Sequence, residues 1–365
     1  MKFSAQREII LKPLQAVIGV VERRQTMPIL SNVLVVARDG ALTITATDLE
    51  VELAAQISLE VDSPGEITVP GRKLLDICRA LPGDVAVTVS VDGDKATVRA
   101  GRSRFKLTTL PAGDFPTVDE IATQQTLTLE RTDLKRVLEK THFAMAQQDV
   151  RYYLNGMLLE TDGAVLRAVA TDGHRLALCE VPLASGSTTS EQVIVPRKGV
   201  LELQRLLDGE GSVALTIGSN HIRAELEGIR FTSKLIDGRF PEYGRVLPNN
   251  PGNVVTADRD LLRHALQRAA ILSNEKYRGI RLDLGPNTVT IQANNPEQEE
   301  AEEALEVEYA GDEMEIGFNV NYLLDALAAV NSEQVQMGLV DSNSSCLIHG
   351  PGQDDEKFVV MPMRL

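Results

Sequence analysis

Alternation of apolar and polar residues runs through most of the chain. In GIRLDLG at 279–285 and in TVTIQAN at 288–294, every second residue is apolar. A period of two is typical of a β-strand with one buried face, because successive side chains point to opposite sides of a sheet. Turn signals such as Asp39-Gly40, Asp92-Gly93 and Asp162-Gly163 join runs of this kind. The pattern therefore predicts short antiparallel strands linked by hairpins.

A second set of segments carries apolar residues at spacings of three and four, which is typical of a helix with one buried face. These predicted helices cover residues 6–24, 72–81, 131–145, 197–207, 259–271 and 320–330. Helices that cover one face of antiparallel sheets define the α+β fold class. We assign the chain to that class.

Three sequence markers recur at one period. The first is Ala46-Thr47-Asp48, Ala170-Thr171-Asp172 and Ala293-Asn294-Asn295, with separations of 124 and 123 residues. The second joins a strand to a helix at Pro70, Pro196 and Asn319, and the third places Phe105, Phe231 and Phe358 126 and 127 residues apart. The chain is therefore predicted to hold three copies of a domain of about 120 residues. Their expected bounds are 1–124, 125–250 and 251–365.

Composition narrows the class of protein. With 43% hydrophobic and 24% charged residues, the chain has the composition of a soluble globular protein. Cys78, Cys179 and Cys346 are far apart and outside any CxxC motif, so they are expected to be reduced core residues rather than disulfides or metal ligands. No apolar run is long enough for a membrane span, and the N-terminus lacks a signal-type core. We expect a cytoplasmic protein with no membrane partner and no cofactor.

The charge distribution favours a nucleic-acid partner although the net charge is −15. The first five predicted helices hold 17 Lys and Arg against 7 Asp and Glu, whereas the remaining chain holds 20 basic and 45 acidic residues. Equivalent helices in three repeats would form a continuous basic surface, which suits the backbone of double-stranded DNA without sequence readout. A merely solvated basic face is the alternative. The absence of Trp weighs against a platform for stacking single strands.

The two ends of the chain carry opposite charge. Arg99, Arg102, Arg104 and Lys106 lie within eight residues, whereas ten acids lie between Glu297 and Glu315. Such ends would pair head to tail between two molecules, and a contact of this kind that closes by symmetry gives a ring. An acidic surface that only aids solubility is the alternative.

The segment RAVATDGHRLALCEV at 167–181 is the candidate for a catalytic site, because Asp172 and His174 lie close to Thr171 in the sequence. A catalytic relay needs a nucleophile, yet the chain has no GxSxG, HExxH or Walker A motif. A histidine beside an arginine is more often structural than a base. Two alternatives to DNA binding stay open at this point, an enzyme and an interaction scaffold that never meets DNA.

Several longer blocks resemble one family throughout the chain. QDVRYYLNGML, ATDGHRLA, VIVPRKGV, DGRFPEY, ANNPEQEEAEE and the terminal VVMPMRL resemble the bacterial β sliding clamp, the processivity subunit of the replicative DNA polymerase III holoenzyme. The resemblance implies three clamp domains per chain and a homodimeric, head-to-tail ring around double-stranded DNA. It also implies no enzymatic activity. The implied partners are the replicative polymerase, the clamp loader and other proteins with a clamp-binding motif.

The resemblance also implies functional residues, position by position. A pocket for client peptides, between the second and third domains, would use Leu154, Thr171, Gly173, His174, Arg175, Leu176, Pro241, Arg245, Val246, Tyr322, Val359, Met361, Pro362, Met363, Arg364 and Leu365. DNA contacts would come from Arg24, Gln148, Tyr152, Tyr153, Arg197 and Lys198. The dimer interface would use Lys73, Arg102, Arg104, Phe105, Leu107, Ile271, Leu272, Glu297, Glu299 and Glu300. Asn343 departs from the apolar residue expected at one wall of the pocket.

Overall fold

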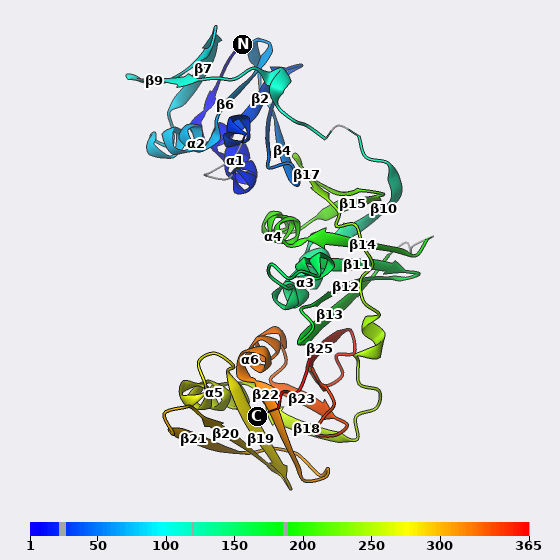
Figure 1. Cartoon of the computed structure of the whole chain (residues 1–365). Helices are drawn as coiled ribbons and strands as arrows, with labels where there is room; N and C mark the ends of the chain where they lie inside the picture. The colour runs from blue at the N-terminus through cyan, green and yellow to red at the C-terminus, as the bar shows by residue number, and fades with distance from the viewer. Residues whose placement is uncertain (22–26, 119, 185–188, 365) are drawn as a thin grey trace. The chain divides into compact units, whose positions relative to one another are not determined.

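The computed structural model of the chain describes residues 1–21, 27–118, 120–184 and 189–364. They form two compact units (Figure 1). Unit 1 consists of Met1–Thr132 and Lys198–Leu235, and unit 2 consists of Asp133–Arg197 and Ile236–Leu365. Among the described residues, no helix combines the length and the apolar character needed to cross a membrane.

Unit 1 contains two antiparallel sheets. The smaller has the order β5-β1-β7-β8-β9, made of β5 (Val61–Ser63), β1 (Lys2–Gln6), β7 (Ala86–Asp92), β8 (Lys95–Ala100) and β9 (Ser103–Thr108). The larger has the order β10-β15-β16-β17-β4-β3-β2-β6, made of β10 (Thr123–Glu130), β15 (Ser212–Gly218), β16 (His221–Leu226), β17 (Ile229–Lys234), β4 (Val51–Ser58), β3 (Ala41–Thr47), β2 (Asn32–Arg38) and β6 (Gly65–Pro70).

Unit 2 repeats this plan. Its larger sheet has the order β14-β11-β12-β13-β25-β24-β23-β18, made of β14 (Glu191–Pro196), β11 (Gly156–Asp162), β12 (Val165–Thr171), β13 (Arg175–Pro182), β25 (Glu356–Val360), β24 (Cys346–His349), β23 (Gln334–Leu339) and β18 (Asn253–Asp258). Its smaller sheet has the order β21-β20-β19-β22, made of β21 (Glu300–Glu306), β20 (Thr288–Asn294), β19 (Gly279–Gly285) and β22 (Met314–Asn319).

Both larger sheets are shared between neighbouring repeats. β17, from the second repeat, pairs with β4 of the first, and Phe231 lies opposite Leu53. β25, from the third repeat, pairs with β13 of the second, and Phe358 lies opposite Ala177. Strand edges expose unpaired backbone groups, and this pairing covers one edge of the first repeat and one edge of the second with a strand of the next repeat. The repeats seen in the sequence are therefore joined by sheets that cross their expected bounds.

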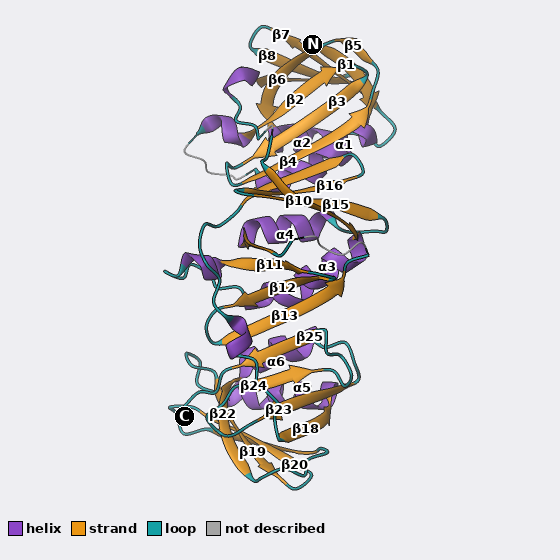
Figure 2. Ribbon diagram, turned by 90° about the vertical axis from the view of Figure 1, so that its right-hand side faces the viewer, coloured by secondary structure: helices purple, strands orange, loops and turns teal. Residues whose placement is uncertain are grey.

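The helices lie close to their predicted positions. They are α1 (Arg7–Val17), α2 (Gly71–Ala80), α3 (Arg131–Thr141), α4 (Arg197–Leu206), α5 (Arg259–Ala269) and α6 (Val320–Ala329). α1 packs on β3 and β4, and α5 and α6 lie against one side of the sheet that contains β18 and β25 (Figure 2). Helices on antiparallel sheets confirm the α+β class.

The first helix of each repeat is shorter than predicted. α1, α3 and α5 pass into 3-10 turns at η1 (Ile18–Val20), η4 (His142–Ala144) and η7 (Ala270–Leu272). Each turn is followed by a residue with extended backbone, Val21, Met145 or Ser273, which stops the helix. The apolar spacing continues through these tighter turns, so the pattern overestimates the helix. Residues 22–24 of the first predicted helix lie outside the described residues.

Candidate peptide-binding, DNA-contact and interface sites

The turn between β12 and β13 is fixed by its own side chains. Asp172 Oδ1 accepts hydrogen bonds from the backbone N–H of His174 at 2.9 Å and of Arg175 at 3.0 Å. Thr171 Oγ1 donates to the Arg175 carbonyl at 2.6 Å and accepts from the Gly173 N–H at 3.1 Å. Gly173 has φ +89°, a conformation that glycine adopts without strain. Asp172 and Thr171 thus shape the turn, and neither is hydrogen-bonded to the His174 ring in the described structure.

Arg175 joins this turn to α6. Its guanidinium lies 4.6 Å from the centre of the Tyr322 ring, donates to the Phe143 carbonyl at 2.8 Å and is bonded to Asp325. The His174 ring stacks on Tyr322 with 6.3 Å between ring centres. Burial, followed by the charge of Asp172, raises the Tyr322 pKa above its ordinary value. The turn of the second repeat and the first helical turn of α6 in the third repeat therefore form one surface.

The C-terminal segment lies along this surface. The Met361 N–H donates to the His174 carbonyl at 2.9 Å, and the Met363 N–H donates to the Gly317 carbonyl at 2.9 Å. Met361 is 39% exposed, Pro362 and Met363 are half-buried and Arg364 is exposed. Leu365 lies outside the described residues. The predicted pocket thus has an apolar rim held by backbone hydrogen bonds.

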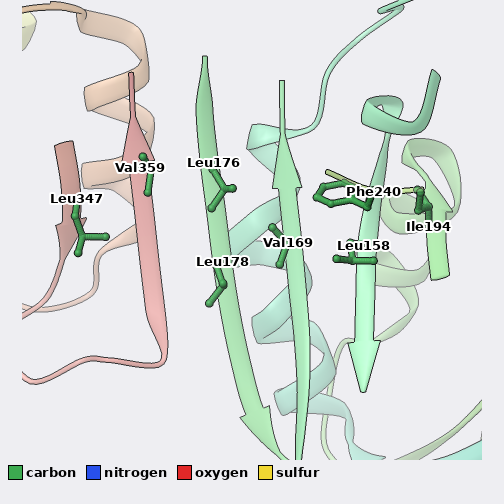
Figure 3. Packing of buried hydrophobic residues seen from close by; sticks show 8 residues of the cluster. All are labelled: Leu158, Val169, Leu176, Leu178, Ile194, Phe240, Leu347 and Val359. Atoms are coloured by element: carbon green, nitrogen blue, oxygen red, sulfur yellow. The ribbon is translucent and has the colours of Figure 1, made fainter. Parts of the chain in front are cut away.

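Buried residues support the surface from below. Leu176 and Val359 lie opposite each other on β13 and β25. Both belong to one apolar cluster that extends across neighbouring strands of the larger sheet, from β14 to β24 (Figure 3). The full cluster is Leu158, Val169, Leu176, Leu178, Ile194, Phe240, Leu347 and Val359. Leu154 is also buried, at 2% exposure. Of the predicted pocket residues, Leu154, Leu176 and Val359 therefore belong to the buried core beneath the site rather than to its exposed surface.

The segment that carries Pro241, Arg245 and Val246 is anchored by a polar network that the sequence did not reveal. In η6 (Tyr243–Arg245), the Tyr243 hydroxyl donates to Glu160 and accepts from Arg167 Nη1 at 3.0 Å. Arg167 also forms ion pairs with Glu160 at 2.8 Å and with Glu180 at 2.9 Å. Pro241, Arg245 and Val246 are exposed beside this anchor.

The electrostatics of this network follow from its burial. Burial alone would raise the Glu160 pKa, but hydrogen bonds from Tyr243, Gln192 and Arg167 hold it below the ordinary value. Burial, with the bond to Glu160, raises the Tyr243 pKa to about 12. The tyrosine therefore stays a neutral donor and the glutamate stays ionised near neutral pH. These contacts could not be predicted from a local sequence motif, because Glu160, Arg167 and Tyr243 come from three separate elements.

The site as a whole combines apolar and cationic groups. Met361, Met363 and Val246 supply exposed or half-buried apolar surface, whereas Arg245 and Arg364 supply exposed positive charge. Apolar anchors with a few polar contacts are typical of a site for an extended peptide. Methionine side chains are unbranched and adaptable, which suits several different peptides. We refer to this surface, made of the turn at residues 171–175, Tyr322, the exposed residues 241, 245 and 246, and the C-terminal segment from Met361, as the tail site.

The predicted DNA contacts are found in several places. Gln148, with φ +57°, lies in a loop before η5 (Tyr152–Asn155). Tyr152 is 59% exposed, whereas Tyr153 packs partly against the apolar cluster of unit 2. Arg197 begins α4, and Lys198 is bonded to Asp48. Arg24 lies outside the described residues.

The predicted interface residues lie on two edge strands and beside them. In unit 1, β9 is at the edge of its sheet, with Arg102 and Arg104 exposed, Phe105 half-buried and Leu107 only 8% exposed. Lys73 is exposed on α2. The described strands show no pairing on the outer side of β9. Leu107 therefore belongs mainly to the core of its own unit.

In unit 2, β21 is the corresponding edge. Glu297, Glu299 and Glu300 are exposed at its start. Ile271 is 75% exposed and Leu272 is half-buried on the turn that follows α5. A basic edge in one unit and an acidic edge with an exposed isoleucine in the other are thus both available for pairing.

Comparisons with known proteins cover the whole chain. Models of the DNA polymerase III beta subunit match in three parts, the N-terminal domain at residues 1–119, the central domain at 128–242 and the C-terminal domain at 244–364. The chain is 59% identical to the beta sliding clamp of Pseudomonas putida and 55% identical to that of Escherichia coli K12, each over 100% of both chains. It also resembles the solved structure of DNA polymerase III subunit beta from Pseudomonas aeruginosa, with a TM-score of 0.98 and 57% identity, and that of Caulobacter crescentus pol III beta, with 0.96 and 40%, again over all of both chains.

Proposed function

The chain belongs to the family of bacterial beta sliding clamps, the beta subunits of DNA polymerase III, and we propose that two copies close into a ring that encircles duplex DNA. Members of this family are processivity factors rather than enzymes. The ring keeps the polymerase on its template because a closed ring cannot leave a long duplex sideways. We place the protein in the cytoplasm, where this work is done.

The main observation in support of a ring is that two edge strands have no backbone partner on their outer side among the described residues. By the spacing of Phe105, Phe231 and Phe358, strands β9, β17 and β25 are equivalent in the three repeats. β17 pairs with β4 and β25 pairs with β13, and by the same repeat β21 is the equivalent of β4 and β13. The strands equivalent to β9 and β21 are therefore paired within the chain. Among the described strands, the outer edges of β9 and β21 themselves have no partner. Pairing β9 with β21 of a second copy fills both edges.

The repeat also predicts the register of this pairing. Arg230 lies opposite Ala54 at one junction and Lys357 lies opposite Leu178 at the other. The equivalent pair at the seam is Arg104 with Glu302 of the partner subunit. By the same step, Lys106 lies opposite the partner subunit's Glu300 and Phe105 lies opposite the partner subunit's Ala301. Two pairs of opposite charge directly across a sheet favour this register over its neighbours.

Further predicted contacts surround this strand pair. Lys73 and Arg102 are near the basic edge, and Glu297 and Glu299 are near the acidic edge. Ile271 and Leu272 supply the apolar part of the seam. Two chains, each with three domains at 1–124, 125–250 and 251–365, then give six domains per ring. The three matched family regions, 1–119, 128–242 and 244–364, support these bounds.

Charge supports duplex DNA as the molecule that passes through the ring. The predicted helices hold most of the excess positive charge, whereas the chain as a whole carries −15. Weak, salt-screened contacts to phosphates let a ring slide, since tight binding would hold it in place. We assign such contacts to Arg24, Gln148, Tyr152, Tyr153, Arg197 and Lys198.

The tail site is proposed to bind the polymerase, the clamp loader and other clients through short linear peptides. Its support is the combination described above, which joins an adaptable apolar rim to cationic side chains. Asn343 lies beside Asp341, whose side chain accepts the Asn343 N–H at 2.8 Å, and it makes that part of the wall polar. We expect this change to affect the preference among clients rather than the site itself.

Encirclement has a direct topological test. The protein is loaded on nicked circular DNA with a clamp loader and ATP, and the DNA is then cut once. Retention on circles and rapid loss after cutting are the expected result, because only a ring threaded on DNA depends on a free end. Equal retention on circular and cut DNA would favour an interaction scaffold that never encircles DNA.

A further inference from the structure

The turn between β3 and β4 in unit 1 repeats the turn of the tail site bond for bond. Asp48 Oδ1 accepts from the N–H of Glu50 at 2.9 Å and of Val51 at 2.7 Å. Thr47 Oγ1 donates to the Val51 carbonyl at 3.0 Å and accepts from the Leu49 N–H at 3.1 Å. These are the bonds that Thr171 and Asp172 form 124 residues later.

The strand beside this turn also repeats. The Lys234 N–H, at the end of β17, donates to the Glu50 carbonyl at 2.8 Å, as Met361 does to His174 in the tail site. Ser233 lies opposite Val51, as Val360 lies opposite Arg175. The first junction between repeats therefore has the backbone framework of the second.

A hollow of about 180 Å³ is present at this framework. We call it the first-junction groove, and it is lined by Thr47, Leu49, Glu50, Val51, Glu52, Pro116, Thr117, Val118, His221, Thr232 and Lys234. All of these residues belong to unit 1. A cavity of about 150 Å³ is enough to hold a benzene ring, so this groove has room for one aliphatic side chain.

Leu49 has an unusual backbone conformation for a residue with a large side chain. It has φ +79° and is 41% exposed, whereas glycine occupies the equivalent position at Gly173. A left-handed conformation is disfavoured for a residue with a Cβ, and this side chain is only partly buried. Strained residues of this kind concentrate at binding sites. Leu49 therefore presents a partly exposed apolar side chain at the groove from a strained backbone conformation.

The polar groups of the groove differ from those of the tail site. Glu50 and Lys234 are exposed on the rim and have opposite charge. Glu52 is 2% exposed and accepts the Val118 N–H at 2.8 Å, which holds the lining segment 116–118 against β4. The buried His221 Nε2 has no hydrogen-bond partner among the described residues. The rim thus presents one anion and one cation on either side of an apolar wall, whereas the tail site has an apolar rim with cationic side chains beside it.

From this geometry we infer that the first-junction groove is a second peptide-binding site, whose ligand is an extended segment with an aliphatic side chain between one basic and one acidic residue. The aliphatic side chain contacts Leu49 and Pro116 in the hollow. The basic residue lies at Glu50 and the acidic residue at Lys234. The inference goes beyond the peptide binding proposed for the tail site, and it depends on the residues of unit 1 alone.

The test uses fluorescent, acetylated heptapeptide pools with a fixed centre. Two pools carry Lys-Leu-Glu and Glu-Leu-Lys, because the groove does not fix the direction of the peptide. Two control pools carry Lys-Ser-Glu and Gln-Leu-Gln, and the outer positions are mixtures of Gly, Ala, Ser and Thr. Binding to the intact protein is measured by anisotropy. We expect one leucine-centred charged pool to bind with a Kd below about 1 mM, at least tenfold more tightly than the serine-centred pool.

Two variants locate the binding. Leu49→Gly restores the residue of the equivalent turn and removes the strain, so its melting temperature should be equal to or above that of the wild type, while its peptide affinity falls at least tenfold. Glu50→Lys should lower affinity for the charged pools but not for Gln-Leu-Gln. His174→Ala removes the ring that stacks on Tyr322 in the tail site, and it should leave this binding unchanged.

Three results would overturn the inference. They are no saturable binding by either charged pool, equal binding of the leucine and serine pools, and binding that survives Leu49→Gly. If the surviving binding is lost in His174→Ala, the peptides bind at the tail site instead. Failure of the proposed ring or of the tail site would be seen in dimer mass or in client binding, neither of which depends on Leu49.

Discussion

The seam of the proposed ring can be weakened by the double variant Ile271→Ala with Leu272→Ala. Ile271 is 75% exposed in the single chain, so most of its side chain is free to be buried by a second copy. Full burial of a large aliphatic side chain is worth about 1.5–3 kcal/mol, and three quarters of that is about 1–2 kcal/mol per seam. A closed dimer has two seams, so Ile271 alone contributes about 2–4 kcal/mol.

This energy converts to a measurable change in affinity. At about 1.4 kcal/mol per factor of ten, the dimer Kd should rise roughly 30- to 700-fold. Leu272 is half-buried already, so its truncation adds to the effect at the seam and also costs some stability of the chain. Sedimentation velocity over a dilution series, from micromolar to low nanomolar protein, measures the Kd directly.

A matched control separates the seam from a general effect of lost apolar surface. Leu261 is 61% exposed on α5 but is not assigned to the seam. Leu261→Ala should leave the dimer Kd unchanged. The reasoning is refuted if the double variant dimerises within threefold of the wild type, or if Leu261→Ala dissociates the ring equally.

Four further predictions concern the register, the tail site and, in two cases, the buried network. Arg104→Glu should dissociate the dimer, and Arg104→Glu combined with Glu302→Arg should restore it in sedimentation; no restoration would contradict the register. Deletion of residues 363–365 should abolish client-peptide binding in a calorimeter and leave the dimer mass unchanged; surviving affinity would place the site elsewhere. Tyr243→Phe should cost about 1–3 kcal/mol in urea unfolding, because it removes one of the hydrogen bonds to the ionised Glu160 and leaves those from Arg167 and Gln192; a cost below about 0.5 kcal/mol would show that the network does not anchor the segment. Because the Glu160 pKa lies below its ordinary value of 4.5, the stability it provides is present above that pH and lost as the pH falls through the folded pKa; the stability difference between the wild type and Glu160→Gln should shrink on acidification, and a constant difference would contradict this sign.

Local patterns in the sequence were enough to predict the helices and strands and their threefold repetition. Strands follow from alternation because neighbouring side chains of a strand point to opposite faces, and helices follow from spacings of three and four. The three markers gave the period of the repeat. Such patterns depend on residues a few positions apart, and for this reason they predicted helix existence well and helix ends poorly, as at η1 and η7.

The charge of the two chain ends was also readable in advance, but its structural role was not. The sequence places Arg104 and Glu300 in oppositely charged segments. Only the sheet order places them on β9 and β21, the edges that remain when β17 and β25 have paired with the preceding repeat. Which strand pairs with which is a property of the whole chain, because backbone hydrogen bonds carry no information about residue type.

Tertiary structure alone decided how the sites are supported. The hydrogen bonds from Tyr243 to Glu160 and from the Val118 N–H to Glu52 join residues 83 and 66 positions apart. Neither pair has a local signature, since a buried polar group is satisfied by whatever group the fold brings near it. The sequence therefore determined the elements and the repeat, and the fold decided the strand partners, the buried polar contacts and the hollow beside Leu49.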